Sequence, residues 1–269
     1  MTFLRELTIS VPSDAPAIFP YTVPFVRQVK RVAFPAVTFL AGENGSGKST
    51  LLEALACAAE LPTVGAESVN TDPTLADVRG FTRKCVKLVW SKRSRKGFFL
   101  RTEDFFGFAK RVAQDKADAQ AAIDEIERDY SDRSDFAKGL ARMPHSRSLL
   151  DIRERYGEGL DANSHGEGFF KLFQSRFSGP GLYLMDEPEA ALSPTRQLTL
   201  LSMLHQVVGQ GAQFVIATHS PILMAYPRAT IYAFGEEGLH EAPYETLEHV
   251  VVTREFLANP GAYLRHLLE

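Results

Sequence analysis

AVTFLAGENGSGKST, residues 36 to 50, is the segment of the chain from which its fold can be predicted. It begins with six mostly apolar residues, a pattern typical of a buried strand in a parallel sheet. The glycines that follow permit backbone angles that other residues rarely adopt. Residues 51 to 61 are rich in leucine and alanine, which favours a helix. The stretch therefore predicts a buried strand, a tight glycine-rich turn and a helix, in that order.

The turn fits the pattern G-x-x-x-x-G-K-[ST] in full, which indicates a phosphate-binding loop. Gly45 and Gly47 allow successive N–H groups to point at one anion, and the following helix adds its positive dipole end. Lys48 carries a full charge for the β- and γ-phosphates, and Ser49 has a hydroxyl for a magnesium ion. We therefore expect ATP and Mg²⁺ as ligands, contacted by Gly42, Glu43, Asn44, Gly45, Ser46, Gly47, Lys48, Ser49 and Thr50.

A second apolar strand ends in two acidic residues. Leu182-Tyr183-Leu184-Met185 has the composition of a buried strand, and Asp186 and Glu187 follow it directly. Open α/β sheets bind their ligands at the carboxyl ends of the strands. We expect Asp186 to hold Mg²⁺, directly or through water, and Glu187 to accept a proton from attacking water. Together with the phosphate loop, this pair predicts magnesium-dependent ATP hydrolysis.

Composition agrees with an ordinary globular protein. The chain has 269 residues, 45% hydrophobic and 23% charged, with a formal net charge of −3. That balance does not mark the whole chain as a nucleic-acid binder. Its two cysteines, Cys57 and Cys85, form neither a disulfide framework nor a metal-ligand pair. No apolar run approaches the roughly 20 residues that span a bilayer, so we expect a cytoplasmic protein without direct membrane insertion.

The order of expected elements predicts the fold class. Buried strands at residues 36–41, 182–185 and 214–217 alternate with helical segments, which indicates a mainly parallel sheet. A further strand is expected at residues 230–234. Residues 3–11 and 26–32 are expected to form further strands. Two apolar runs within residues 84–102, joined by a basic turn ending in Gly97, predict a hairpin. We therefore expect an α/β fold with a mainly parallel core sheet, a small antiparallel sub-sheet and a helical insertion at residues 104–160. Residues 144–168 are expected to be irregular.

These residues, with three more stretches, resemble the ABC-class ATPases over about residues 3 to 235. The stretch Leu184-Met185-Asp186-Glu187-Pro188-Glu189 resembles the magnesium-binding strand of that class with its glutamate and proline. Ala191-Leu192-Ser193-Pro194 resembles the D-loop, although Ser193 stands where many transporter subunits carry Asp. Ala217-Thr218-His219-Ser220-Pro221 resembles the switch-histidine loop. The resemblance implies that His219 contacts the γ-phosphate and helps to orient the attacking water.

Asn163-Ser164-His165-Gly166-Glu167-Gly168 resembles the signature motif of the same class. Ser164, Gly166 and Glu167 match the motif, while Asn163 and His165 depart from it. In the family this motif completes the nucleotide site of the opposite protomer. The resemblance therefore implies a head-to-tail homodimer with ATP between the protomers; a loop with a serine helix cap is the alternative.

The chain also departs from the class. The Gln that commonly links the sheet to the helical sub-domain is missing, and we expect Glu103 to replace it as a magnesium or water contact, unless it is simply a helix-capping acid. The chain resembles stand-alone bacterial ATPases and the heads of RecF and SMC-type proteins, as a single ABC-type ATPase domain over residues 1–269. Its insertion is too short for a long coiled-coil arm.

Three functions are consistent with this resemblance. The first is a conformational cycle driven by ATP hydrolysis, in DNA maintenance or phage defence. The second is an ATP-gated clamp or scaffold in which hydrolysis is slow and an unknown protein is the partner. The third is the energising subunit of an ABC transporter, against which the missing Gln counts.

Two weaker features remain open. Residues 83–101 are rich in cations with aromatic residues between them, which predicts either a nucleic-acid backbone site or a solvated hairpin with a buried aromatic face. The cations are Arg83, Lys84, Lys87, Lys92, Arg93, Arg95, Lys96 and Arg101. Tyr21 and Phe25 are candidates for stacking on adenine, with ordinary core packing as the alternative.

Overall fold

The computed structural model describes residues 2–64, 68–94, 96–156, 165–177, 179–235 and 238–268. The chain divides into two compact units. The first comprises Met1–Thr63, Glu67–Thr102 and Ser178–Glu269, and the second comprises Val64–Ala66 and Glu103–Phe177.

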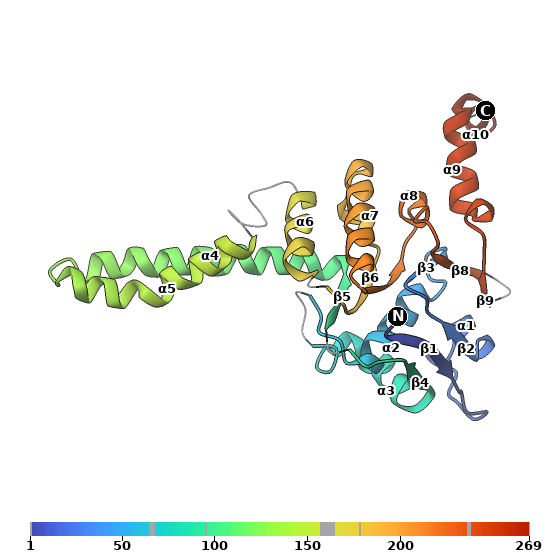
Figure 1. Cartoon of the computed structure of the whole chain (residues 1–269), viewed down its shortest axis with the longest axis horizontal. Coiled ribbons are helices and arrows are strands. Elements are labelled where there is room, and N and C mark those ends of the chain that lie inside the picture. The colour runs from blue at the N-terminus through green and yellow to red at the C-terminus, as the bar shows by residue number, and fades with distance from the viewer. Residues whose placement is uncertain are drawn as a thin grey trace. The chain divides into compact units, whose positions relative to one another are not determined.

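A six-stranded sheet forms the centre of the first unit (Figure 1). Its strand order is β5-β6-β7-β3-β8-β9, and neighbours run parallel except for β8 and β9. The strands are β3 (Val37–Gly42), β5 (Gly97–Arg101), β6 (Leu182–Asp186), β7 (Gln213–Ala217), β8 (Thr230–Gly235) and β9 (Gly238–Glu241). This arrangement confirms the expected α/β fold with a mainly parallel core sheet.

The register of the parallel strands brings three chain segments to one edge of the sheet. Ala217 pairs with Leu40 on β3 and with Asp186 on β6. Asp186 in turn pairs with Arg101 at the end of β5. The glycine-rich turn, the acidic pair and the segment after β7 therefore leave the sheet side by side, at the edge where open α/β sheets bind ligands.

A three-stranded antiparallel sheet accompanies the first, as expected. Its order is β2 (Arg31–Ala33), β1 (Leu4–Ile9) and β4 (Val86–Trp90). Gln213, the first residue of β7, is fully buried and joins the two sheets. Its side-chain amide donates to the carbonyls of Leu4 and Phe34 at 2.7 and 2.9 Å, and its carbonyl accepts from the Leu4 N–H at 2.8 Å. A buried amide with these partners fixes one sheet against the other.

The hairpin expected within residues 84–102 is wrong. Its two runs form β4 and β5, which belong to different sheets. Gly97 makes the change of sheet possible. Its φ of 127° is a conformation that residues with a side chain rarely adopt. A Cβ at this position would also lie 1.8 Å from the Leu182 carbonyl oxygen. Phe98, Phe99 and Leu100 are all buried, so the run is a buried parallel strand at the edge of the six-stranded sheet rather than one face of a hairpin.

The strand expected at residues 26–32 is only partly present. A short helix, α1 (Pro24–Gln28), takes its first residues and β2 takes its last. Pro24 at the first helical position has its φ already set for a helix. Phe25 and Val26 are 1% exposed and anchor α1 in the core.

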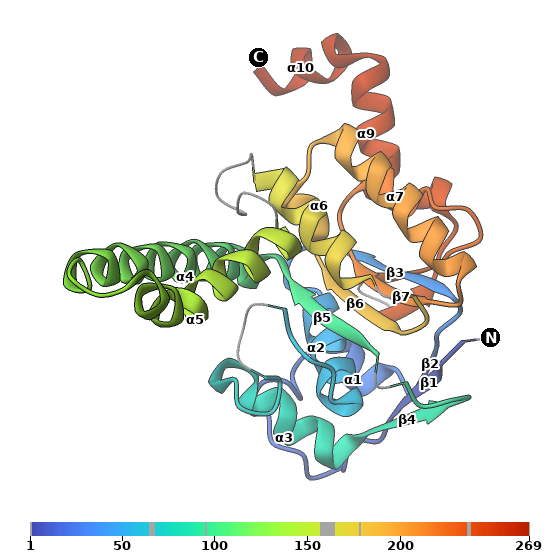
Figure 2. The ribbon, with the colours of Figure 1, turned by 60° about the vertical axis from the view of Figure 1, so that its left-hand side comes forward.

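Helices cover both faces of the six-stranded sheet. Figure 2 shows α2 (Lys48–Ala59) on one face and α7 (Pro194–Gly209) on the other. On α2 the residues Leu51, Leu52 and Leu55 are 1% exposed or less. The other helical segments of this unit are η1 (Pro73–Leu75), α3 (Ala76–Cys85), η2 (Pro188–Ala191), α8 (Pro221–Met224), η3 (Tyr244–Thr246), α9 (Glu248–Ala258) and α10 (Pro260–Leu268).

The second unit is helical. It contains most of α4 (Thr102–Asp129), with α5 (Asp135–Tyr156) and α6 (His165–Arg176). Both views show α4 and α5 side by side, and Arg142 pairs with Glu127 at 2.6 Å. The irregular segment expected at residues 144–168 is wrong up to Tyr156, because α5 continues through Pro144, and it is wrong again from His165, where α6 begins. Among the described residues, no helix combines the length and apolarity that crossing a bilayer requires.

Candidate functional site

The glycine-rich turn between β3 and α2 has the backbone that its sequence predicts. Gly42, Gly45 and Gly47 have φ values of 148°, 78° and 106°, which other residues rarely adopt. A Cβ on Gly47 would lie 2.6 Å from the Val23 side chain, and one on Gly42 would lie 2.8 Å from the Phe234 carbonyl oxygen. The turn is therefore restricted to glycine at two positions by close packing as well as by φ.

Lys48 begins α2 and buries its charge in the turn. It is 3% exposed, and its Nζ donates to the carbonyls of Gly42 and Glu43 at 2.8 Å each. Burial lowers the pKa of Lys48, while the carboxylates of Glu187 and Asp186 oppose the change. Two carbonyls use two of the three N–H donors of an ammonium group. A buried cation held in this way favours an anion beside it.

The turn holds a second polar group suited to a ligand. Ser46 Oγ is buried and has no hydrogen-bond partner among the described atoms. Leaving such a group unpaired costs about 1–3 kcal/mol, which a ligand with acceptor oxygens would recover. Ser49, in the first turn of α2, is half-buried, and Thr50 is 8% exposed.

Glu187 has an unusual backbone at the end of β6. Its φ and ψ are 49° and 50°, a left-handed conformation that costs a residue with a side chain about 1–3 kcal/mol. The Glu187 N–H donates to the Ala217 carbonyl at 2.9 Å. Thr102 Oγ1 lies 2.6 Å from the Glu187 carbonyl oxygen and 3.0 Å from that of Asp186. These backbone contacts stabilise the strained conformation of Glu187.

His219, two residues after β7, lies beside Glu187. Its Nε2 is 3.4 Å from Glu187 Oε1. Burial lowers the pKa of His219, and the nearby Lys48 acts in the same direction, against the raising effect of Glu187. The imidazole is therefore biased toward its neutral form, in which one nitrogen donates and the other accepts.

Two residues of this group were missed by sequence reasoning. The backbone N–H of His219 donates to Glu189 Oε1 at 2.6 Å, and burial raises the pKa of the Glu189 carboxyl. His249, on α9, lies 3.0 Å from His219 Nδ1 with its Nε2. The sequence does give a signal for Glu189, because it is a second acidic residue only two positions after Glu187. His249 lies 30 residues beyond His219 in an ordinary helical pattern, which gives no local signal.

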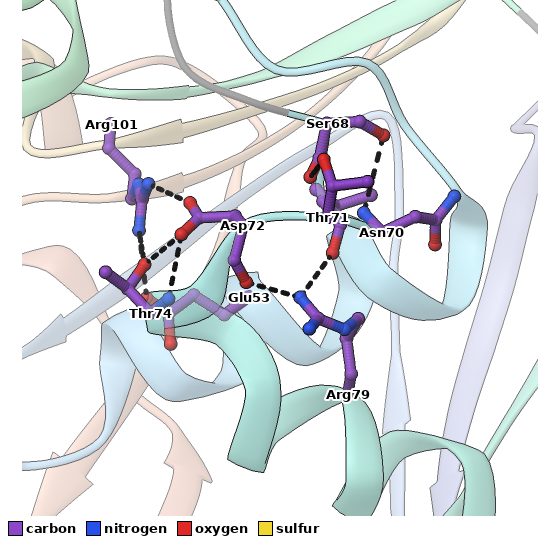
Figure 3. A network of polar contacts seen from close by, with 9 residues as sticks. Glu53, Ser68, Asn70, Thr71, Asp72, Thr74, Arg79 and Arg101 are labelled. Carbon is purple, nitrogen blue, oxygen red and sulfur yellow. Dashed lines mark hydrogen bonds and ion pairs between the residues drawn. The ribbon is translucent and has the colours of Figure 1, made fainter.

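A buried polar network secures β5 next to the acidic pair (Figure 3). Arg101 donates to Asp72 at 2.7 Å and to Thr74 Oγ1 at 3.3 Å, and it lies 3.8 Å from Glu53 on α2. Burial pushes the pKa of Asp72 upward, but the hydrogen bonds from Thr74 and Arg101 outweigh it and hold that pKa below its usual value. Arg101 is 7% exposed, so it is a structural cation rather than part of a basic surface.

The donor set is suited to magnesium. Ser49 and Asp186 offer a hydroxyl and a carboxylate, the oxygen ligands that Mg²⁺ prefers. Within the described ranges, no three His, Cys, Asp or Glu residues are grouped to hold a metal. Mg²⁺ usually takes one or two protein oxygens and completes its shell with phosphate and water, so the residues present fit the ion. Glu103 is exposed in the first turn of α4, in the second unit.

A cavity of about 460 Å³ adjoins the turn. It is lined by residues of the turn, α1, β8, β9 and the start of α9, including Asn44, Gly45, Ser46, Phe25 and Glu248. Phe25 is 1% exposed and packs edge-on against Phe234, with ring centroids 5.5 Å apart. Tyr21 is 9% exposed and packs edge-on against Phe81. Both aromatic candidates for adenine are thus core residues, although Phe25 contributes to the cavity wall.

The signature-like segment is described only in part. Asn163 and Ser164 of this segment lie outside the described residues. The same is true of Arg95, one of the cations within residues 83–101. Gly166 and Glu167 are in the first turn of α6, where the structure gives the backbone but not their side chains.

Comparison with known proteins identifies the family. Residues 74–225, more than half of the chain, match the model of the family described as "AAA domain, putative AbiEii toxin, Type IV TA system". The chain belongs to this family and is an ABC-type P-loop ATPase.

Sequence relatives agree with this class. The chain is 26% identical over 236 residues to the "Energy-coupling factor transporter ATP-binding protein EcfA2" of Methanospirillum hungatei, covering 87% of this chain and 53% of that protein. It is 24% identical over 238 residues to the "Cobalt import ATP-binding protein CbiO" of Salmonella paratyphi A, covering 82% of this chain and 78% of that protein. The chain thus spans about half the length of the first relative. The solved Smc head domain of Pyrococcus furiosus, bound to a domain of ScpA, is 11% identical with a TM-score of 0.48, covering 95% of this chain and all of that one.

The buried network in Figure 3 predicts a pH-dependent contribution to stability. Asp72→Asn should lower the free energy of unfolding at pH 7 by about 2 kcal/mol, because Arg101 loses its nearest carboxylate. A depressed pKa stabilises the fold above the ordinary carboxyl value and is lost as the pH falls through the folded value. The difference between wild type and variant should therefore shrink below pH 3.8, the ordinary value for Asp.

Urea unfolding followed by circular dichroism at several pH values measures this difference. The matched control is Asp115→Asn, which removes an exposed carboxylate from α4. A difference between wild type and Asp72→Asn that stays constant as the pH falls would contradict the role given to the Asp72 charge.

Proposed function

We propose that this chain binds ATP in the turn at residues 42–50 and hydrolyses its γ-phosphate with Glu187 as the base. The observation that carries the proposal is the buried Lys48 ammonium, held in the turn at the sheet edge where the Glu187–His219 pair also lies. A phosphate chain would pair with that ammonium, and its terminal phosphate would extend toward the pair. Glycine positions with positive φ and the unpaired Ser46 hydroxyl support the same ligand.

Each residue of the turn has a separate task in this proposal. Lys48 pairs with the β- and γ-phosphates, and the N–H groups of the turn and of the start of α2 bind their oxygens. Ser46 donates its hydroxyl to the same phosphates. Ser49 and Asp186 would hold Mg²⁺, which when bound neutralises phosphate charge. The cavity beside the turn accommodates the nucleoside end of the nucleotide.

Hydrolysis requires a water placed between the γ-phosphate and Glu187. The water oxygen forms a bond to the γ-phosphorus while the bond from that phosphorus to the bridging oxygen of ADP breaks. The proton of the water passes to the Glu187 carboxylate. Glu187 is 40% exposed at its side chain, so water reaches it, and the 3.4 Å contact with His219 restricts its orientation. His219 donates from Nε2 to the γ-phosphate or to the water.

The complete site requires a second copy of the chain. The resemblance of residues 163–168 to the signature motif supports a head-to-tail dimer in which Ser164, Gly166 and Glu167 of one protomer contact the ATP of the other. The start of α6 at His165 supports it further, because a helix N-terminus favours an anion. In this dimer ATP joins the protomers, and hydrolysis releases them.

The comparisons suggest two candidate biological processes for this chain. The printed names of the two relatives favour an energising subunit of a transporter, for which a membrane protein would co-purify with the chain. The family description names a toxin–antitoxin system, which favours defence. For such a role, and for DNA maintenance, the ATP cycle would act on a soluble partner. Purification of the tagged chain from its own cells in detergent separates the transporter from these alternatives.

A cationic cavity favours nucleic acid as one partner. A cavity of about 340 Å³ between α2, α3 and β4 is lined by Arg79, Arg83, Arg93 and Trp90, among others. Arg83 is exposed and Trp90 is half-exposed, whereas Arg93 pairs with Glu60 at 3.2 Å. Cations beside an accessible indole suit a phosphate backbone and an unstacked base. The partner surface proposed within residues 83–101 is thus this cavity and its rim, without Arg101.

The hydrolytic mechanism predicts a specific phenotype for Glu187→Gln. The variant keeps the shape of the side chain but cannot accept the proton, so ATP turnover should fall by a factor on the order of 10² or more. ATP binding should persist, because Lys48, Ser49 and Asp186 are unchanged. Trapped ATP should then hold two protomers together, and sizing with light scattering should give a dimer with ATP and a monomer without it.

Adding Ser164→Arg to this variant tests the shared site. The added bulk should break the ATP-dependent dimer while each chain still binds ATP. The matched control is Ser148→Arg on α5, which should leave the dimer intact. Normal turnover by Glu187→Gln would reject Glu187 as the base. A variant that no longer hydrolyses ATP but stays monomeric at saturating ATP would reject the shared site.

The cationic cavity predicts salt-dependent binding of single-stranded nucleic acid. Arg83 and Arg93 line the cavity, and the exposed Lys92 precedes Arg93 in the chain. Reversing all three to Glu should abolish a fluorescence-anisotropy signal with a labelled oligonucleotide, because phosphate contacts dominate affinity. The wild-type affinity should fall linearly on a log–log plot against salt. Reversal of Lys110, Arg111 and Lys116 on α4 is the matched control and should leave binding unchanged. No binding by the wild type, or equal loss in both triple variants, would reject this surface.

A further inference from the structure

His249, a residue outside the predicted site, contacts the histidine that the sequence singles out. Its Nε2 lies 3.0 Å from His219 Nδ1, and the two ring centroids are 5.1 Å apart with planes at 54°. The other ring nitrogen of His219 is the one that lies 3.4 Å from Glu187. A second imidazole therefore lies at hydrogen-bond distance from one nitrogen of His219, while the Glu187 carboxylate lies near the other nitrogen without a hydrogen bond to it.

One arrangement of protons suits both neighbours of a neutral His219. A carboxylate repels a lone pair, so the Glu187 oxygen at 3.4 Å favours the form in which His219 Nε2 carries the proton. Nδ1 of the same neutral ring is then an acceptor, and His249 Nε2 must donate to it. The neutral form is the one favoured here, because burial, Lys48 and His249 all lower the pKa of His219.

The first turn of α9 is anchored where it makes this contact. Leu247 and Val250, on either side of His249, are 5% and 4% exposed. Tyr244, in η3, donates its hydroxyl to the Pro221 carbonyl at 3.1 Å, close to the loop that carries His219. Glu248 lines the cavity beside the phosphate-binding turn. The start of α9 therefore belongs to the surroundings of the nucleotide site, although nothing in its sequence indicates this.

We propose that His249 is a positioning residue for ATP hydrolysis, which donates from Nε2 to His219 Nδ1 and so holds His219 as the Nε2–H tautomer. A hydrogen bond to one ring nitrogen of a neutral histidine determines which of the two nitrogens carries the proton. With His249 in place, His219 presents a donor to Glu187 and to the γ-phosphate. Without it, the Nδ1–H tautomer would also be populated. That form presents a lone pair to the Glu187 carboxylate and to phosphate oxygens, so both contacts would be repulsive in it. This inference rests on the proposed hydrolytic role of Glu187 and His219.

Two substitutions at one position test the role through turnover. His249→Leu removes the donor, and its kcat should fall about tenfold, the rate equivalent of one lost hydrogen bond. Its KM for ATP should change by less than about twofold, because Lys48 and the turn still bind the phosphates. His249→Gln offers an amide N–H in place of the imidazole N–H and should recover most of the kcat. His240→Leu, an exposed histidine on β9, is the matched control and should behave as wild type.

The tautomer itself can be observed without ATP. In protein labelled with ¹⁵N-histidine, long-range ¹H–¹⁵N spectra distinguish the two neutral tautomers of each of the seven histidines. The signal of His219 is the one missing from a His219→Gln sample. It should report the Nε2–H form in the wild type and in His249→Gln, and a mixture in His249→Leu.

The outcomes separate this inference from the proposed function. A wild type with His219 as the Nδ1–H form, or a His249→Leu protein with unchanged tautomer, overturns the positioning role even if turnover falls. Unchanged kcat in His249→Leu overturns it as well. A wild type that does not hydrolyse ATP would instead overturn the proposed function, and the tautomer measurement would still decide the contact between the histidines.

Discussion

The burial of one positive charge is the constraint on which the site depends. Lys48 is 3% exposed, and two backbone carbonyls hold its Nζ within the turn that carries it. Carbonyl dipoles compensate part of the cost of removing an ammonium group from water, and a buried cation remains costly until an anion pairs with it. The close packing at Gly42 and Gly47 keeps the turn in the shape that makes this burial possible. The phosphate-binding property thus follows from the strain and packing of the turn, and not from the lysine alone.

The parallel sheet determines which groups share the edge with that charge. Because β3, β6 and β7 are in register, the residues that follow them emerge together, and Glu187 and His219 come within 3.4 Å. Glu187 holds a left-handed backbone that Thr102 and the Ala217 carbonyl stabilise. Strain of this kind persists only where the surroundings fix it, and such positions cluster at functional sites. A base in a fixed orientation is what general-base catalysis requires.

Sequence reasoning succeeded where chemistry is local and failed where it depends on contacts between distant residues. The turn at 42–50 and the buried strands were predicted correctly, because glycine spacing and short apolar runs specify them directly. The hairpin was wrong because Gly97 turns the chain into a second sheet, and alternation along one segment carries no information about that partner. Glu189 and His249 were missed because both act by touching His219. The same limit applies to Arg101, whose charge suggested a surface while Asp72 and Glu53 hold it inside the fold.

Calorimetric titration of ATP with magnesium into the wild type and into Lys48→Ala measures whether the buried ammonium binds phosphate. If the buried ammonium of Lys48 exists to pair with phosphate, the wild type should bind ATP, and the variant should lose at least about a hundredfold in affinity, as expected for a charge-assisted contact removed from a buried site. Lys110→Ala, which removes an exposed ammonium from α4, should bind as the wild type does. Equal affinity of the wild type and Lys48→Ala for ATP would contradict the account, because it would place the phosphates away from the turn on which the site has been built.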